Sequence, residues 1–210
     1  MTQFVKPSEA PDLATITRML DAATPEQRFT WIRSLGRSEQ SKLFEMAKGT
    51  RCAVADLVDH EADVVVCDGK NGVPVFSKFK KVFTKLGDEF AGWNDNTELA
   101  GPLSGVAGWL IGPGHFTAYD DPAGTGEIFV DYRKIPARQH PSFPPLVGNE
   151  HGIAGLVFGD MVDVVRRVSE HVYVGDSFKG KYPRNTPPPL MAKIGAMLAT
   201  APFVMCRRVA

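Results

Sequence analysis

The sequence predicts an α+β fold, in which a mainly antiparallel β-barrel over residues 50–210 follows an N-terminal helical segment over residues 1–49. Three observations lead to this prediction. Residues 1–49 carry the start and stop signals of short helices. From Thr50 onward, alternating apolar residues, glycines and prolines replace the helical period. Residues 155–178 form a predicted hairpin that is apolar on both faces, as expected of a wall that encloses a ligand and is covered outside.

The helical segment divides into three short helices. Asp12 can cap the first, which ends near Ala22. The run Thr24-Pro25-Glu26-Gln27 is a strong start signal for the second, which ends near Leu35. The third extends from Ser38 to Lys48. Their apolar stripes are too narrow to build a core alone, so we expect the helices to pack on the sheet.

The remainder of the chain contains short alternating segments separated by turn residues. We expect strands at Arg51–Leu57, Ala62–Cys67, Glu89–Asn94, Trp109–Ile111, His115–Asp120, Glu127–Arg133, Met161–Val168, His171–Phe178 and Phe203–Val209. The apolar residues of segment 75–86 also fit a helix, but the alternation of Phe76, Lys78 and Lys80 with apolar residues favours a strand or bent strand. A last helix is expected at Leu190–Ala199, and the proline-rich residues 134–154 are expected to form a loop across a barrel end or a lid. Strands of this number with mostly short connections favour a closed antiparallel barrel with room for one small ligand. A curved sheet with helices in its concave face, as in NTF2-like folds, is the alternative.

The predicted hairpin supplies the first candidate for chemistry. Closure by a two-residue or four-residue loop pairs Arg167 with Val172, and this register sets Asp163 opposite Asp176. Two facing carboxylates inside a barrel must share a proton or hold a cation such as Arg167 or Arg133. Burial and a like charge shift the pKa of a carboxylic acid, as general acid/base catalysis requires. The structural alternatives are a pair of surface aspartates or a register that differs from this one.

Further candidates lie on other predicted strands. His171 and Tyr173 share a face with Arg166, where they could orient a carbonyl group and transfer a proton. His115, Tyr119, Asp131 and Arg133 form a polar set that faces either the interior or solvent. The predicted catalytic residues are therefore Asp163, His171 and Asp131. The predicted substrate-binding residues are Trp93, Asn94, Trp109, His115, Tyr119, Arg133, Arg167 and Tyr173.

The run Met161–Val168, followed by Val172 and Gly175, resembles a segment of the GxWxG-type family of uncharacterised small lipocalin-like β-barrel proteins. The Gly-x-Trp-x-Gly motif itself is missing, although residues 91–94 and 108–110 approach it. The resemblance implies a lipocalin-like barrel with an apolar cavity. It implies no catalytic residue.

Composition removes several classes of function. The 24 basic and 24 acidic residues cancel, so a nucleic-acid partner is not expected. The sequence has no dinucleotide fingerprint, Walker motif or set of metal-ligand spacings, so we expect neither a cofactor nor a metal. No signal-peptide or membrane-helix pattern is seen, which together with three cysteines without CxxC spacing favours a cytoplasmic protein with free thiols.

Two functions fit these observations. The first is a cofactor-independent acid/base enzyme of specialised metabolism, such as an isomerase, cyclase or lyase, that acts on a small apolar or aromatic molecule. The second is a carrier or sensor that binds the same kind of molecule without chemistry. A partner-binding module that uses the leading helices is a third hypothesis. The small molecule is the expected partner, and assembly as a homodimer stays open.

Overall fold

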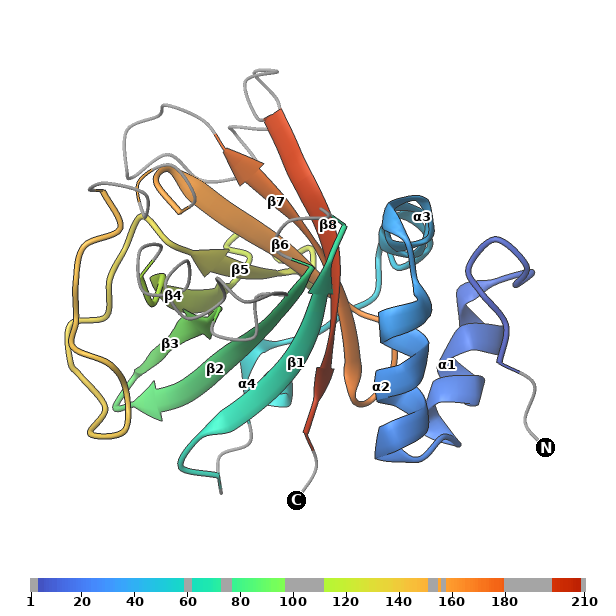
Figure 1. Ribbon diagram of the computed structural model, residues 1–210, viewed down its shortest axis with the longest axis horizontal. Coiled ribbons are helices and arrows are strands. Elements are labelled where there is room, and N and C mark those ends of the chain that lie inside the picture. The colour runs from blue at the N-terminus through green and yellow to red at the C-terminus, as the bar shows by residue number, and fades with distance from the viewer. Residues whose placement is uncertain are drawn as a thin grey trace, which may run out of the picture.

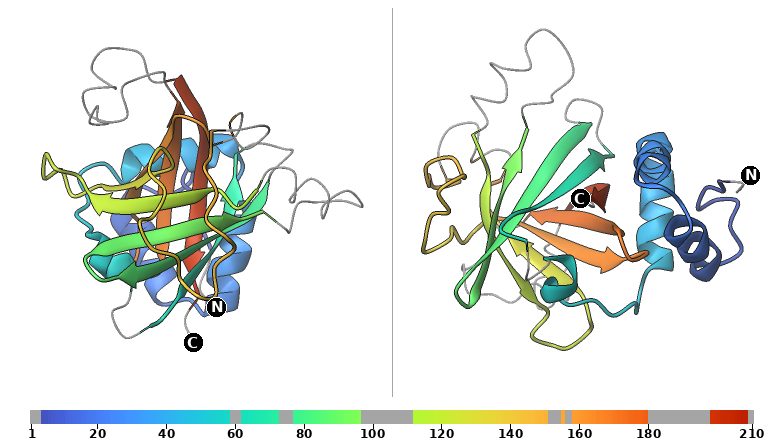
Figure 2. Two further views of the ribbon diagram at one scale, coloured as in Figure 1. Left: turned by 90° about the vertical axis from the view of Figure 1, so that its left-hand side faces the viewer. Right: turned by 90° about the horizontal axis from the view of Figure 1, so that it is seen from below.

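The computed structural model is a closed antiparallel barrel of eight strands, with helices packed against one side (Figure 1). Each strand pairs with the next one along the chain, and the last pairs with the first. The structure describes residues 4–58, 62–72, 77–96, 112–150, 155, 158–179 and 198–208, with side chains of the last range described from residue 201. The predicted fold class is confirmed, and the helices lie outside the barrel rather than in the concave face of an open sheet (Figure 2).

The helices are α1 (Leu13–Asp21), α2 (Pro25–Ser34), α3 (Arg37–Met46) and α4 (Val54–Leu57). The strands are β1 (Val65–Asn71), β2 (Lys78–Leu86), β3 (Glu89–Asp95), β4 (His115–Asp120), β5 (Ile128–Asp131), β6 (Met161–Arg167), β7 (Val172–Lys179) and β8 (Leu198–Arg207). No helix in the described part of the chain is long and apolar enough to cross a membrane.

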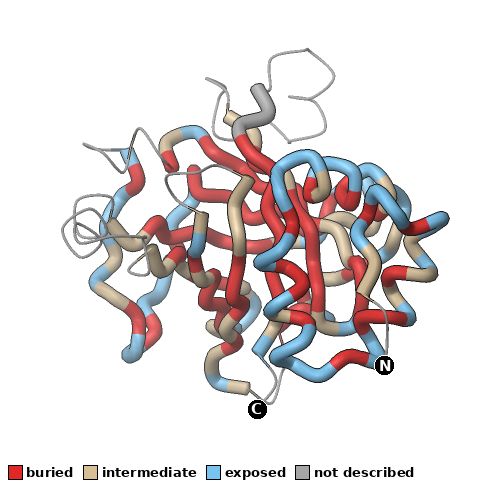
Figure 3. Tube along the Cα trace, turned by 45° about the vertical axis from the view of Figure 1, so that its right-hand side comes forward, coloured by how far each residue is buried: buried red, intermediate tan, exposed pale blue. Residues whose placement is uncertain are grey.

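Helices α2 and α3 pack on the outer face of the barrel at β1, β7 and β8, and α1 reaches the β6–β7 turn, where the Thr17 hydroxyl donates to Val168 O. The predicted caps are present, because Asp12 accepts a hydrogen bond from the backbone N–H of Thr15 and Thr24 forms a capping box with Gln27. The buried side chains of this outer core are Ile16, Leu20, Trp31, Ile32, Leu35, Leu43, Phe44, Val162, Val164, Val172, Val174 and Val204. The strands between the helices and the interior are therefore buried on both faces, which explains the doubly apolar hairpin (Figure 3).

The inward faces of the strands form a second core that is rich in aromatic rings. Its largest members are Phe79, Phe83, Phe116, Tyr132, Phe158, Tyr173 and Phe203. Three inward phenylalanines each lie over an inward glycine that is their cross-strand partner; the pairs are Phe79 with Gly69, Phe116 with Gly92, and Phe203 with Gly175. A Cβ at any of these glycines would overlap the ring, so glycine is what allows the rings to lie flat along the wall.

The register predicted for the hairpin β6–β7 is wrong by one residue. Arg167 pairs with Tyr173 rather than Val172, because residues 169–171 form a three-residue loop closed by Val168 N–H donating to Val172 O at 2.9 Å. The buried Ser169 hydroxyl accepts a hydrogen bond from Val172 N–H at 3.2 Å and stabilises this loop. A one-residue shift moves every side chain of one strand to the other face.

Several boundary predictions also change. The first strand of the barrel covers Val65–Asn71 rather than Ala62–Cys67. Residues 54–57 are helical rather than extended, because Asp56 accepts from the backbone N–H of Ala53 and Asp120 accepts from that of Val54. Leu198 and Ala199, predicted to end a helix, belong to β8. Residues 190–197 and the predicted strand Trp109–Ile111 lie outside the described residues.

Candidate functional site

The two ends of the barrel differ. Helix α4 packs at one end, where Val54 and Leu57 contact the interior core (Figure 2). The opposite end, called the loop end below, is where β1–β2, β3–β4, β5–β6 and β7–β8 are connected. Binding sites of β-barrels commonly lie in such a mouth.

A polar cluster lies inside the barrel near the loop end and centres on Lys81 Nζ. Lys81 Nζ lies 2.8 Å from Asp163 Oδ2 and 3.1 Å from Asn94 Oδ1, and it also contacts the Tyr132 hydroxyl. The Tyr132 hydroxyl donates to the same Asp163 oxygen at 3.3 Å. All four residues are buried. The other oxygen, Asp163 Oδ1, is buried and has no hydrogen-bond partner in the part of the chain that the structure describes. We call these four residues the inner cluster.

Strand alternation explains how the inner cluster forms. On β2, Phe79, Lys81 and Phe83 share the inward face. Asn94 is the cross-strand partner of Lys81, and Tyr132 follows β5, where its backbone N–H donates to Met161 O at 3.1 Å. Asp163, two residues into β6, faces Lys81 across the interior.

Aromatic rings surround the Lys81 ammonium. Its Nζ lies 5.3 Å from the ring centre of Phe79, 5.5 Å from that of Phe116, 4.9 Å from that of Tyr132 and 5.1 Å from that of Phe203. The negative ring faces partly replace the water that the cation loses on burial. The three phenylalanines here are those that lie over glycines, so the glycine–phenylalanine pairs build the cage.

Burial changes the acid strength of two members of the inner cluster. It lowers the pKa of the Lys81 ammonium, while the Asp163 carboxylate acts in the opposite direction. Burial and then the Asp163 charge raise the pKa of the Tyr132 phenol well above its usual value, so Tyr132 stays protonated as a donor. The arrangement therefore holds an amine, a carboxylate and a phenol within proton-transfer distance of one another.

A second polar set lies on the outside of the same wall. Asp131 accepts two hydrogen bonds from the Arg133 guanidinium, from Nε at 2.8 Å and from NH2 at 2.7 Å. It also accepts from the Tyr119 hydroxyl at 3.0 Å and from the Arg133 backbone N–H at 3.0 Å. Burial raises the pKa of Tyr119, so its hydroxyl is a donor here. We call these three residues the outer cluster.

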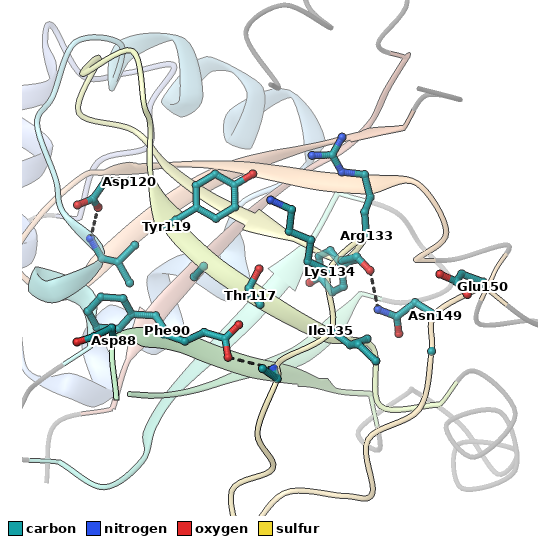
Figure 4. Close-up of a pocket in the computed structure, with 16 residues that line it drawn as sticks. Asp88, Phe90, Thr117, Tyr119, Asp120, Arg133, Lys134, Ile135, Asn149 and Glu150 are labelled. Carbon is teal, nitrogen blue, oxygen red and sulfur yellow. Dashed lines mark hydrogen bonds between the residues drawn. The ribbon is translucent and has the colours of Figure 1, made fainter. Parts of the chain in front are cut away.

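Residues 133–150, called the strap below, run along the outer face of β3 and β4, at the left of Figure 1. Hydrogen bonds fasten the strap at both ends of the barrel, from Ala137 N–H to Glu89 at 3.1 Å and from the Asn149 amide to Tyr132 O at 2.9 Å. Between the strap and the wall lies a pocket of about 970 Å³ that Thr117, Tyr119 and Arg133 help to line (Figure 4).

The structure thus separates the predicted site residues into groups. Asp163 and Asn94 meet in the inner cluster, whereas Tyr119, Asp131 and Arg133 meet outside. Trp93 and His115 also point outward and lie beneath the strap, where Trp93 contacts Phe143 and His115 Nε2 lies 3.0 Å from Pro145 O. His171, Arg167 and Tyr173 lie near α4, at the opposite end from Asp163. Trp109 lies outside the described residues.

The corrected register also changes two predicted pairs. Asp163 faces Ser177 rather than Asp176, and Asp176 points outward as the cross-strand partner of Val164. Tyr173 shares its face with Arg167 rather than with Arg166. The cation held by Asp163 is Lys81 rather than Arg167 or Arg133.

Sequence reasoning missed Lys81 and Tyr132. The run Phe79-Lys80-Lys81-Val82-Phe83 contains the signal for Lys81, because a strand that buries both phenylalanines must also turn Lys81 inward. Tyr132 lies between two polar residues, and the same alternation turns it inward once Asp131 and Arg133 face out. The three cysteines are free and buried, and burial raises the pKa of Cys52 to about 12 and of Cys206 to about 11, so these two thiols are not nucleophiles at neutral pH.

No protein-family model, curated protein or solved structure matches this chain. The resemblance of residues 161–175 to the GxWxG-type family stays a prediction.

Proposed function

We propose that the protein binds a small apolar or aromatic organic molecule at the loop end of the barrel and acts on it as a cofactor-independent acid/base enzyme, an isomerase, cyclase or lyase. One observation carries the proposal: Lys81, Asp163, Tyr132 and Asn94 converge on one point of a mostly apolar, aromatic interior. Convergent ionisable groups in a water-poor site are typical of proton-transfer catalysis.

Each member of the inner cluster has a role in such a reaction. Asp163 Oδ1, which has no hydrogen-bond partner among the described residues, is the base that removes a proton from carbon. Lys81 and the Tyr132 hydroxyl are the donors that stabilise the negative charge developing on a substrate oxygen. The rings of Phe79, Phe116 and Phe203 contact the apolar part of the molecule.

A non-catalytic carrier is the alternative, and the number of polar groups distinguishes the two. A carrier needs an apolar cavity with one polar group that fixes the ligand. A cation, a carboxylate and a phenol at one point exceed that need and favour the enzyme.

Deuterium exchange tests the proposal without knowledge of the natural substrate. Binding of benzyl alcohol, 2-naphthol and 4-phenyl-2-butanone is measured by calorimetry, and incorporation of deuterium beside the carbonyl group of 4-phenyl-2-butanone is then followed by mass spectrometry. We expect exchange in the parent protein and in Glu45→Gln, on the exposed face of α3, and loss of exchange with retained binding in Asp163→Asn. Binding without exchange in the parent favours the carrier, and failure of every compound to bind defeats the proposal.

A further inference from the structure

Lys81 is an unusual choice for the interior of a barrel. Its side chain is 3% exposed and that of its partner Asp163 is 2% exposed. A buried ion pair of this kind contributes little net stability, because the cost of removing two charges from water offsets their attraction. The pair therefore calls for a functional explanation.

The form of the pair favours chemistry at nitrogen. Lysine, unlike arginine, can lose its proton when it is buried and then becomes a nucleophile. The groups that face Nζ from the surrounding elements are Asp163 of β6, Tyr132 after β5, Asn94 of β3 and Cys67 of β1. Asp163 is the carboxylate among them and the group that accepts the ammonium proton, since burial raises the pKa values of the Tyr132 phenol and the Cys67 thiol and keeps both protonated.

We infer that Lys81 forms an imine with the carbonyl carbon of an aldehyde or ketone, so that the substrate class is an apolar or aromatic carbonyl compound. The inference rests on the proposed function and adds to it a covalent intermediate and a substrate class.

The step balances within the inner cluster. Asp163 takes a proton from the Lys81 ammonium, and the neutral nitrogen attacks the carbonyl carbon while the C=O electron pair moves to oxygen. The protonated Asp163 returns its proton to that oxygen, and a second nitrogen proton follows by the same route. Water then leaves with the C–O electron pair, which yields a protonated imine and restores the Asp163 carboxylate. The net change is ammonium plus carbonyl compound to iminium plus water.

The remaining members of the inner cluster suit the steps that follow. A protonated imine withdraws electrons from the adjacent carbon, so it favours loss of a proton or cleavage of a carbon–carbon bond there. No described residue donates a hydrogen bond to Asp163 Oδ1, so this oxygen can accept the released proton. The aromatic cage that surrounds the ammonium would equally surround the iminium, which carries the same charge.

Borohydride trapping tests the inference. The protein is incubated with benzaldehyde, cinnamaldehyde or 4-phenyl-2-butanone and sodium cyanoborohydride, which reduces an imine to a stable secondary amine. Intact-mass and peptide analysis should find one addition, equal to the carbonyl compound less one oxygen atom, on Lys81. We expect Lys81 to react faster than the outward-facing Lys80, because a lowered pKa raises the fraction of neutral amine.

Two variants keep the test independent of folding. Lys80→Arg changes the neighbouring lysine on the opposite face of β2 and should leave trapping unchanged. Lys81→Met combined with Asp163→Asn removes both charges together and should abolish the addition while the far-ultraviolet circular dichroism remains that of the parent. If other lysines of this double variant are trapped as fast as Lys81 is in the parent protein, the inference is overturned.

Benzyl alcohol distinguishes small-molecule binding from imine formation, since it has the ring of benzaldehyde but no carbonyl group. If benzaldehyde and benzyl alcohol bind equally and no compound is trapped on Lys81, the imine is excluded while small-molecule binding stands. If Lys81 is trapped but no deuterium exchange follows, the imine stands and the proton-transfer function fails.

Discussion

The inner and outer clusters each contain a cation, a carboxylate and a tyrosine hydroxyl, and they lie on opposite faces of one stretch of the barrel wall. Tyr132 points inward from the same segment that sends Asp131 and Arg133 outward. Burial does not separate the two ion pairs, because the exposed fractions are 3% and 2% for Lys81 and Asp163 and 2% and 0% for Arg133 and Asp131. What separates them is how completely the carboxylate is satisfied.

Asp131 accepts on both oxygens, since the fork of Arg133 bonds to each and Tyr119 adds a further bond to Oδ2. Such a bidentate pair is geometrically fixed and has no proton to give near neutral pH. Among the described residues, Asp163 accepts on Oδ2 alone, from the Tyr132 hydroxyl and from an amine that can lose its proton. The full set of hydrogen bonds to Asp131 favours a structural role for the outer cluster. The incomplete set to Asp163 favours chemistry in the inner cluster.

The largest expected effect is the loss of the inner cation. Lys81→Met leaves Asp163 charged and buried, and we expect the free energy of unfolding to fall by about 3–5 kcal/mol. Arg133→Met should cost less, about 2 kcal/mol, because Asp131 keeps its hydrogen bonds from Tyr119 and from the backbone. Urea unfolding of the two variants measures the difference.

Lys81→Met combined with Asp163→Asn supplies the control, since no unpaired charge remains and most of the stability should return. A double variant as unstable as Lys81→Met alone would mean that the methylene chain of Lys81, rather than its charge, accounts for the loss.

The aromatic cage gives the second prediction. Gly175→Ala places a Cβ against the Phe203 ring, one wall of the cage around Lys81, and should cost about 1–3 kcal/mol through overpacking. Gly148→Ala in the strap is the matched control, because its Cβ would meet the Glu150 carboxylate at an ordinary 3.6 Å. Thermal unfolding at one pH compares the two; equal stabilities would show that the interior can move the ring away freely.

Much of the fold could be predicted because alternation and capping are local signals. The Thr24 cap, the strand at 115–120 and the doubly apolar hairpin all follow from neighbouring residues. The register of that hairpin could not be predicted, because the Ser169 hydrogen bond that selects a three-residue loop depends on the folded turn. The helical turn at 54–57 depends in part on Asp120, which is distant in sequence.

The site was harder to predict because it depends on which face points inward. Asp163 and Asn94 were found, but Asp131 and Tyr119 have the same residue types and point outward. Asp131 and Tyr119 point outward because Phe116 and Val130, which alternate with them along the same strands, pack into the interior. The segment 75–86 was predicted as a strand, so Phe79 and Phe83 together could have identified Lys81.

Asp176 provides a further carboxylate, which is half-buried on the outside of the barrel and has no salt bridge in the described structure. Burial raises its pKa to about 6, so the folded protein holds a proton that the unfolded chain has lost between about pH 4 and 6. Stability should therefore fall as the pH rises through this range. Asp176→Asn should be more stable than the parent by about 1 kcal/mol at pH 7, discounted for partial solvation, with the gap closing below pH 4. Denaturant unfolding across this pH range measures it; a gap that widens in acid contradicts the raised pKa.

The two tyrosine hydroxyls give the smallest expected effects on stability and the clearest functional comparison of the two clusters. Tyr119→Phe and Tyr132→Phe each remove one hydroxyl that donates to an aspartate, and each should lower the free energy of unfolding by about 1 kcal/mol. Tyr119→Phe keeps its edge contact with Phe129 and should leave deuterium exchange into 4-phenyl-2-butanone unchanged. Tyr132→Phe removes a donor from the inner cluster, so exchange should slow by about tenfold to a hundredfold.

Because the two losses of stability match, a difference in exchange reports chemistry alone. Slower exchange in Tyr119→Phe with no change in Tyr132→Phe would move the reaction to the pocket beneath the strap.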